Sequence, residues 1–183
     1  MNKKKAADRI LLTKQQLFWH FSVVPFLLIP PVFIVIDTIR MYLGDSYKLV
    51  RTKEELLWSA VIFIGTALIS FFIQRARLRF KVFNIECTDE QFDNALEKTS
   101  EDLKWRILTK RKTYVRAGRY WNCSSSWGEL ITIKRKKDKI LINSICDPDT
   151  IPSVISYGWN RHNIKIFMNN LKKQRETVSD IPQ

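Results

Sequence analysis

Two long apolar segments near the start of the chain limit its fold more than any other feature. They cover residues 17–36 (LFWHFSVVPFLLIPPVFIVI) and 56–73 (LLWSAVIFIGTALISFFI), and neither contains Lys, Arg, Asp or Glu. At 1.5 Å per residue, a helix of roughly 20 residues matches the ~30 Å hydrocarbon core of a bilayer. The alternative is a helix pair buried in a soluble core, which needs more chain than the 110 residues that follow. We therefore expect a transmembrane helical hairpin.

The first segment also differs from a removable signal peptide. Such a peptide has an apolar region of about 7 to 15 residues followed by a small-residue cleavage site. Here the apolar run is longer and continues into Asp37 and Arg40 without such a site. We expect the segment to stay in the mature protein.

Basic residues near the two segments predict how the hairpin is oriented. Five precede the first segment, four follow the second, and the connection between them carries four. Because Lys and Arg are enriched in cytoplasmic loops, this excess favours both termini in the cytosol and the connection outside. We expect the protein to lie in the inner (plasma) membrane.

The part of the chain after the hairpin is strongly basic, with 22 Lys and Arg against 13 Asp and Glu from residue 74 onward. Anionic headgroups attract such residues by ~1 kcal/mol each, within about a Debye length. We expect the bilayer to be the partner and expect no nucleic-acid partner. A solvated turn is the alternative for the runs TKRKT and KRKKDK. The candidate headgroup contacts are Arg75, Arg77, Arg79, Lys81, Lys110, Arg111, Lys112, Lys134, Arg135, Lys136 and Lys137.

The residues after the hairpin predict a small α+β domain. RLRFKVFNIE alternates like a half-buried strand, and TDEQFDNALEKTSEDL begins with a Thr88–Gln91 capping box. Its apolar face comprises Phe92, Ala95, Leu96, Thr99 and Leu103. Four strand candidates follow (KWRILTK, TYVRAGRYW, ELITIKR, KILINSI), and then a helix capped by Asn160 with Ile164, Phe167, Met168 and Leu171 on one face. We expect an antiparallel sheet with both helices packed on one face.

The predicted organisation has four parts. They are a basic interfacial segment (1–16), the transmembrane hairpin (17–73), the cytosolic α+β domain (74–173) and a disordered tail (174–183). Three cysteines at no recognisable spacing are consistent with a reducing compartment.

The sequence contains none of the familiar catalytic motifs. G-x-G-x-x-G, the P-loop, H-E-x-x-H, paired C-x-x-C and G-x-S-x-G are absent, and there are two histidines. We therefore expect a protein that is not an enzyme and has no cofactor or metal. One catalytic alternative stays open, in which Cys123 or one of the serines at 124–126 acts with His162, oriented by Asp147 or Asp149.

Aromatic residues cluster in the predicted loops of the domain. Trp127 beside Gly128 fits a core position at a strand entry. The alternative is a ligand-facing or interface lip formed by Trp127, Tyr157 and Trp159, since amphipathic rings suit such positions.

The domain resembles a loose group of uncharacterised bacterial small membrane proteins with two N-terminal spans and a cytosolic α+β domain. The shared features are a W-R-I strand after a helix, an E-x-I-T-I-like strand and a Ser-Gly-Asn-rich helix start. They fall here on Trp105–Arg106–Ile107, on 129–133, and on Ser156, Gly158, Asn160 and Asn163, where the spacing is one residue short. The resemblance covers about half the chain and implies an α+β fold without an activity.

Together these features predict a membrane-anchored cytosolic binding or interaction module. The alternative is a two-span ligand-sensing effector that oligomerises to perturb the membrane, a plan similar to that of two-span effectors of bacterial antiphage defence. A pocket lined by Arg106, Arg116 and Arg119 would favour the effector, whereas basic tips beside the membrane would favour the module. A homo-oligomer and a protein partner both stay open.

Overall fold

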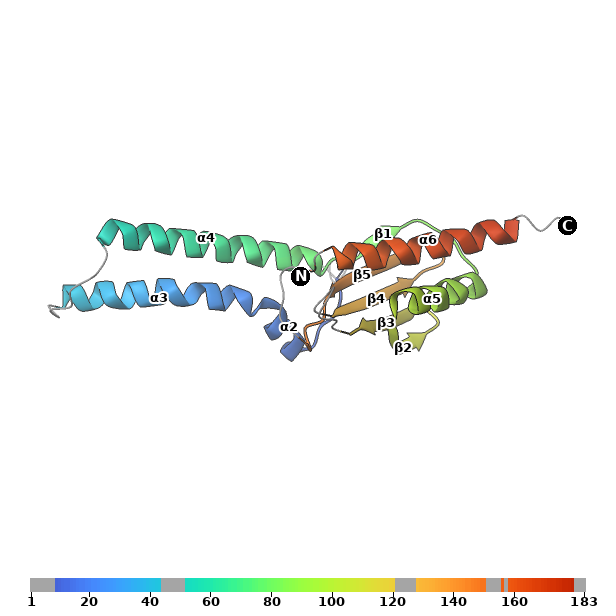
Figure 1. Ribbon diagram of the computed structural model, residues 1–183, viewed down its shortest axis with the longest axis horizontal. Helices are drawn as coiled ribbons and strands as arrows, with labels where there is room; N and C mark the ends of the chain where they lie inside the picture. Colours follow the sequence, from blue (N-terminus) through green and yellow to red (C-terminus); the bar gives the residue numbers. More distant parts are fainter. Residues whose placement is uncertain (1–8, 44–51, 121–127, 151–155, 157, 180–183) are drawn as a thin grey trace.

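The structure is a computed structural model in which a helical hairpin projects from an α+β domain (Figure 1). It describes residues 9–43, 52–120, 128–150, 156 and 158–179. The helices are α2 (Lys14–Phe21), α3 (Val23–Tyr42), α4 (Lys53–Arg77), α5 (Asp89–Leu103) and α6 (Trp159–Ser179). The strands are β1 (Lys81–Phe83), β2 (Arg106–Arg111), β3 (Tyr114–Arg119), β4 (Glu129–Arg135) and β5 (Ile140–Cys146).

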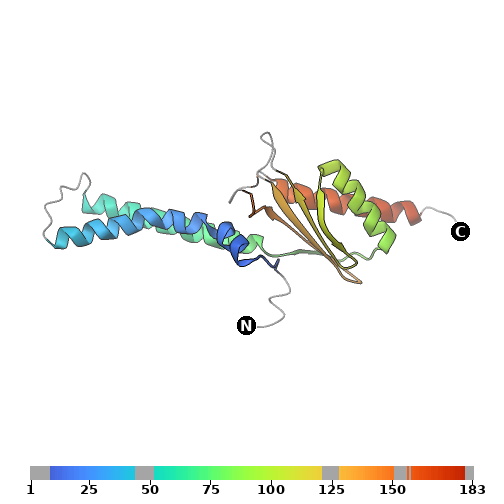
Figure 2. The ribbon, with the colours of Figure 1, turned by 90° about the horizontal axis from the view of Figure 1, so that it is seen from below.

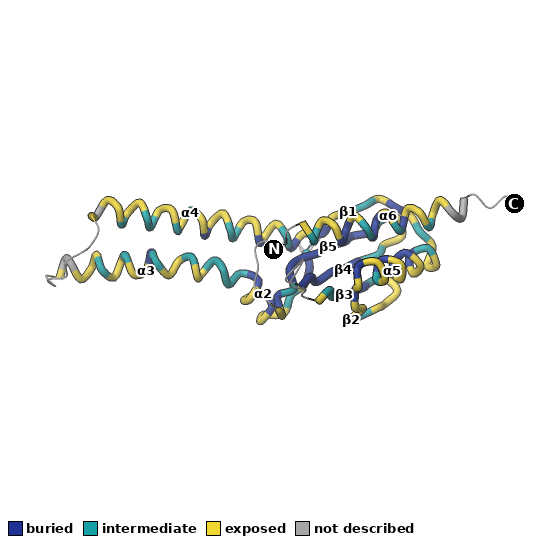
Figure 3. The backbone as a smooth tube through the Cα atoms, viewed as in Figure 1, coloured by how far each residue is buried: buried dark blue, intermediate teal, exposed yellow. Residues whose placement is uncertain are grey.

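Helices α3 and α4 lie side by side and are long and apolar enough to cross a membrane. The candidate spans are Val23–Arg40 and Glu54–Arg77, and 6% of each apolar window is buried. The exposed surface of the hairpin is evident along its whole length in Figure 3. The second span contains the predicted segment 56–73, and the Thr52–Glu55 capping box begins its helix.

The first span starts later than the predicted segment 17–36. The chain turns at Ser22, whose hydroxyl donates to the carbonyl oxygen of Trp19 (2.9 Å). Residues 17–21 therefore belong to the separate short helix α2, which begins with a Thr13–Gln16 capping box.

The domain contains a five-stranded antiparallel sheet in the order β1-β5-β4-β3-β2. Its strand number confirms the prediction, although β1 is only three residues long. The register pairs Lys81 with Ile142 and Phe83 with Ile140. Since β1 leaves the end of α4, the β5 residue Cys146 lies at the hairpin end of the sheet and Ile140 at the far end.

Helices α5 and α6 cover one face of the sheet, as predicted (Figure 2). The Thr88–Gln91 capping box is present, and the five predicted α5 face residues are all buried. In the main core, Phe167 of α6 packs against the rings of Phe92 and Trp105, with centroids 5.8 and 6.3 Å apart. The periodicity of apolar residues therefore predicted this layer correctly.

Helix α6 corrects two predictions. It continues to Ser179, so residues 174–179 are helical where a disordered tail was expected. It also begins at Trp159, which places Asn160 inside the first turn, where its Oδ1 accepts a hydrogen bond from Ser144 Oγ (3.0 Å).

The other face of the sheet is partly covered by the N-terminal segment. A second apolar cluster contains Ile10, Leu78, Phe80, Leu130, Leu141 and Ile145, with Leu12 and Phe21 packed against it. The Ile10 amide donates to the carbonyl oxygen of Leu78 (2.9 Å), which holds the segment in place. Residues 9–16 therefore pack on the domain, in addition to any role at the membrane interface.

Candidate functional site

The hairpin and the domain meet at a set of polar side chains, of which Gln16, His20 and Gln74 are buried. His20 Nε2 lies 3.1 Å from the carbonyl oxygen of Gln74, and Gln74 Nε2 donates to the carbonyl oxygen of His20 (2.7 Å). Gln16 Nε2 donates to Asp149 Oδ2 (2.6 Å), and its Oε1 accepts from Arg116 Nη2 (3.2 Å). These contacts tie α2 to both α4 and the domain.

Helix α2 has the polarity expected of a helix at a membrane surface. Its polar residues Gln16 and His20 are buried against the protein, whereas Leu17, Phe18 and Trp19 are exposed. A helix in water instead turns its apolar side chains toward the protein, because removing apolar surface from water lowers the free energy. An outward apolar face beside a candidate span fits the interfacial region of a bilayer.

The chain segment between α4 and the sheet is held by one buried amide. Asn143 Nδ2 on β5 donates to the carbonyl oxygens of Arg77 and Arg79, each at 2.6 Å. Asn143 is 3% exposed, and its Oδ1 receives no hydrogen bond from the described residues. This anchoring fixes the backbone that carries Arg77, Arg79 and Lys81.

A pocket of about 690 Å³ lies where α4, β1, β5 and the start of α6 meet. We call it the junction pocket. Four basic residues line it, namely Arg77, Arg79, Lys81 and Arg161. No acidic side chain is among the described residues that line it. The structure thus brings three predicted headgroup contacts into one cavity and adds Arg161.

The start of α6 forms one wall of the junction pocket. Gly158 has φ +85°, and a Cβ added there would meet no atom within 4 Å, so the backbone borders open space. Behind this wall, Asn163 Nδ2 donates to Ser144 Oγ (3.3 Å), and Trp105 Nε1 donates to Asn163 Oδ1 (3.2 Å). These buried hydrogen bonds join the start of α6 to the core and fix the wall.

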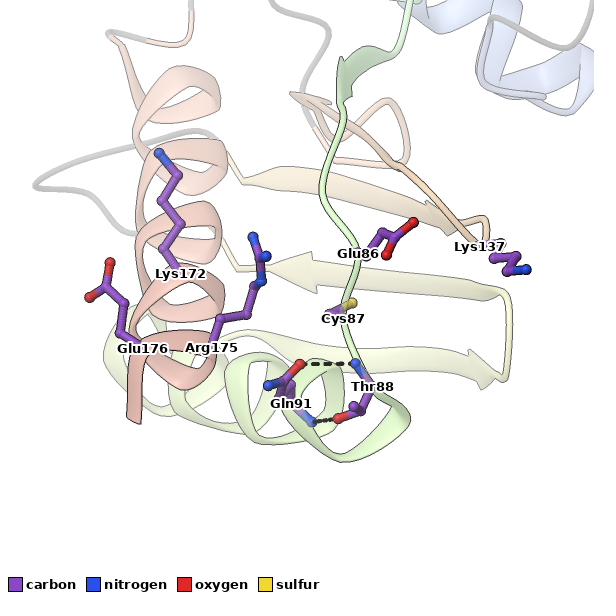
Figure 4. Close-up of a pocket in the computed structure, with 8 residues that line it drawn as sticks. All are labelled: Glu86, Cys87, Thr88, Gln91, Lys137, Lys172, Arg175 and Glu176. Carbon is purple, nitrogen blue, oxygen red and sulfur yellow. Dashed lines mark hydrogen bonds between the residues drawn. The ribbon is translucent and has the colours of Figure 1, made fainter. Parts of the chain in front are cut away.

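A second, wider pocket of about 820 Å³ lies at the far end of the domain (Figure 4). The loop before α5, the β4–β5 turn and the last turns of α6 form it. Three bases and two acids are mixed in its lining, which comprises Glu86, Cys87, Thr88, Gln91, Lys137, Lys172, Arg175 and Glu176. The mixture favours no single class of charged ligand.

Cys87 is the one nucleophilic thiol in this second pocket. Burial raises the pKa of the Cys87 thiol, and the nearby Arg135 opposes that shift. The side chain of Arg135 donates to the carbonyl oxygen of Cys87 (2.7 Å) and to Asp89 Oδ1 (2.5 Å). No histidine lines the pocket among the described residues, so the surroundings of this thiol do not resemble an activated nucleophile.

The basic residues of the two hairpin tips lie at the end of the sheet away from α3 and α4. Strands of six or seven residues place these tips roughly 20 Å from the junction, beyond a Debye length of about 8–10 Å. Several have other partners: Lys110 pairs with Asp93 (3.0 Å) and Lys112 with Asp89 (3.2 Å). Headgroup contact by residues 110–112 and 134–137 stays a prediction, and this placement favours the alternative of solvated turns.

The three arginines expected in a sensor pocket have separate partners. Arg106 donates to Tyr120 Oη, and Arg116 donates to Gln16. The Arg119 guanidinium lies 3.8 Å from the centre of the Trp159 ring and pairs with the buried Glu129 at 3.3 Å.

The predicted aromatic lip is only partly described. Trp127 and Tyr157 lie outside the described residues. Trp159 is half-buried beneath Arg119, which gives it a packing partner within the domain. The predicted ligand or interface role of these aromatics stays a prediction.

The catalytic alternative gains no geometric support from the described residues. Cys123 and the serines at 124–126 lie outside them. His162 is exposed, and its ring packs edge-on against Trp159 (centroids 5.1 Å apart). Asp149 accepts from Gln16, and no group of three metal-ligating side chains occurs in the described part of the chain.

One feature of the sequence could have predicted the polar part of the junction pocket. In KILINSI, Asn143 and Ser144 interrupt a run of apolar residues in a strand that is buried throughout. A polar side chain at such a position needs a hydrogen-bond partner, which here is the end of α4 and the start of α6. Arg161 had no comparable signal because it lies on an exposed helix surface.

Comparisons of the chain with protein-family models, with curated proteins and with solved structures found no match.

Proposed function

We propose that this protein is a membrane-anchored binding module of the inner membrane. In this proposal α3 and α4 cross the bilayer, both termini lie in the cytosol, and the α+β domain rests at the cytosolic surface. The role of the domain is to bind a partner at that surface.

The exposed apolar surface of the hairpin carries the proposal. Eight large apolar side chains are exposed on α3 and nine on α4. Soluble monomers rarely expose contiguous apolar patches larger than a few hundred Å². Helices of 20 and 25 residues extend for ~30 and ~37 Å, which suits a ~30 Å hydrocarbon core.

Two further observations support the placement of the domain. The exposed apolar face of α2 lies directly before the first span, where the headgroup region would begin. Arg75 and Arg77 form the last turn of α4, so positive charge marks the same end of the hairpin.

The test is the labelling of single cysteines in sealed bacterial spheroplasts with a membrane-impermeant maleimide. In a chain whose native cysteines are replaced by serine, Leu43→Cys reports on the end of α3 and Lys98→Cys on the domain. We expect labelling of L43C only, together with resistance of the chain to carbonate extraction. Labelling of K98C in sealed spheroplasts, or extraction by carbonate, would refute the proposal.

One observation favours a second candidate, the two-span effector. The hydrogen bond from Gln16 to Asp149 couples the domain to α2, and that from Gln74 to His20 couples α2 to α4, as a sensor that moves its spans would require. With two spans, such an effector needs an oligomer to enclose a pathway. Two measurements separate the two functions: the mass of the protein in detergent and the depolarisation of the membrane when its expression is induced. A monomer whose expression does not depolarise the membrane would exclude the effector.

A further inference from the structure

We propose that the junction pocket binds the phosphate group of an anionic phospholipid such as phosphatidylglycerol. This inference rests on the proposed membrane anchoring and names the partner of that same surface. The pocket would then fix the domain against the bilayer at one defined headgroup.

The position of the pocket fits a lipid headgroup. Ile73 and Ala76 line it, and both belong to the candidate span Glu54–Arg77. Ile73 is itself 42% exposed, so apolar surface continues from the span to the mouth of the pocket. A phospholipid with its acyl chains along α4 has its phosphate at this height.

The charge of the pocket fits a phosphate. Its described lining contains four basic and no acidic residues, whereas the far pocket mixes Glu86 and Glu176 with its bases. Arg79 and Arg161 are exposed and approach from different elements, the α4–β1 connection and α6. Guanidinium groups bind phosphate oxygens in a two-pronged geometry that a diffuse positive surface does not provide.

The start of α6 and the size of the pocket also fit a phosphate group. The first turn of α6 starts here, and helix N-termini favour anions. The volume of about 690 Å³ is within the ~300–1,000 Å³ typical of ligand pockets.

The test is native mass spectrometry of the full-length protein in mild detergent, titrated with phosphatidylglycerol or phosphatidylcholine. We expect the wild type to prefer phosphatidylglycerol by roughly tenfold or more. The double variant R79Q/R161Q should bind it about 30-fold more weakly, from ~1 kcal/mol for each basic residue.

The matched control is K104Q/K165Q, which removes the same number of positive charges from exposed positions of the domain outside the pocket. Its affinity should fall less than threefold. An equal loss in both double variants would show a diffuse charge effect and refute the pocket. Equal wild-type binding of the two lipids would refute it as well. Thermal unfolding midpoints of both variants, which should match that of the wild type, exclude misfolding.

A soluble phosphate ester carries the same phosphate group as the lipid and is the other ligand that this pocket would fit. Glycerol 3-phosphate that displaces phosphatidylglycerol with equal affinity would overturn the assignment to a lipid. Carbonate extraction of the same preparations keeps the two proposals apart. A chain that resists extraction but shows no headgroup preference refutes only this inference, whereas an extracted chain refutes the anchoring itself.

Discussion

Replacing Gln16 by Ala should loosen α2 without unfolding the domain. Gln16 makes one hydrogen bond to the Asp149 carboxylate (2.6 Å), one to the Arg116 guanidinium (3.2 Å), and one to the amide of Thr13 in the capping box (3.2 Å). Bonds to charged groups contribute ~1.5–3 kcal/mol. Because Asp149 is exposed and Arg116 is half-buried, we assign the low end of this range, ~1.5 kcal/mol, to the two charged contacts together. With about 0.5 kcal/mol for the capping box, the local loss is ~2 kcal/mol.

Hydrogen exchange measures this loss directly. If α2 opens locally, ~2 kcal/mol corresponds to amide exchange about 30-fold faster at residues 17–21. The amides of α5 should be unchanged, because that helix lies on the opposite face of the sheet. The matched control is Gln15→Ala, an exposed position in the same helix turn. A change below threefold for Q16A, or an equal change for Q15A, would refute the role of these hydrogen bonds.

Three further predictions concern the domain. Thr88→Ala removes the N-cap of α5 and should cost about 1 kcal/mol, seen as a lower thermal midpoint, whereas Asn94→Ala at an exposed position should not. Arg119→Ala leaves Glu129, which is 1% exposed, without this partner and should destabilise the domain by roughly 3 kcal/mol; adding E129Q should restore much of the loss in the same melting assay. Because burial raises the pKa of Cys87, a smaller thiolate fraction exists at neutral pH than in a free cysteine peptide. Its alkylation by iodoacetamide, followed by peptide mass spectrometry, should be slower than that of the peptide at pH 7.5 and should accelerate toward pH 10. Equal rates at pH 7.5 would contradict the burial of this thiol.

Local signals in the sequence predicted much of the fold. The Thr88–Gln91 capping box was predictable because it depends on two residues three positions apart, and the Thr52–Glu55 box has the same spacing. The number of strands and the buried face of α5 were also predictable from local sequence. Apolar residues repeat every 2 residues in a strand and every 3.6 in a helix, and both repeats are visible within a few turns or pleats.

Contacts between distant parts of the chain could not be predicted in this way. Gln16 and Asp149 are 133 positions apart, and no periodicity links them. Composition identified Arg77 and Arg79 as candidate membrane contacts. It could not show that the β2–β3 and β4–β5 turns lie at the end of the sheet away from α3 and α4. That assignment depends on which strand pairs with β1, and strand pairing follows from the three-dimensional packing.

Residues 9–21 cover the second face of the sheet, so the order of synthesis determines when this part of the core can fold. Ile10 leaves the ribosome long before its partners Leu141 and Ile145, and both candidate spans are made in between. The second core therefore closes only after the hairpin has been synthesised, and closure joins the two ends of a loop of about 130 residues. A fragment that begins at residue 74 lacks this cover and exposes Leu130, Leu141 and Ile145 to water. Expression of the domain alone should thus yield an aggregation-prone product, whereas the full chain carries the segment that completes this second core.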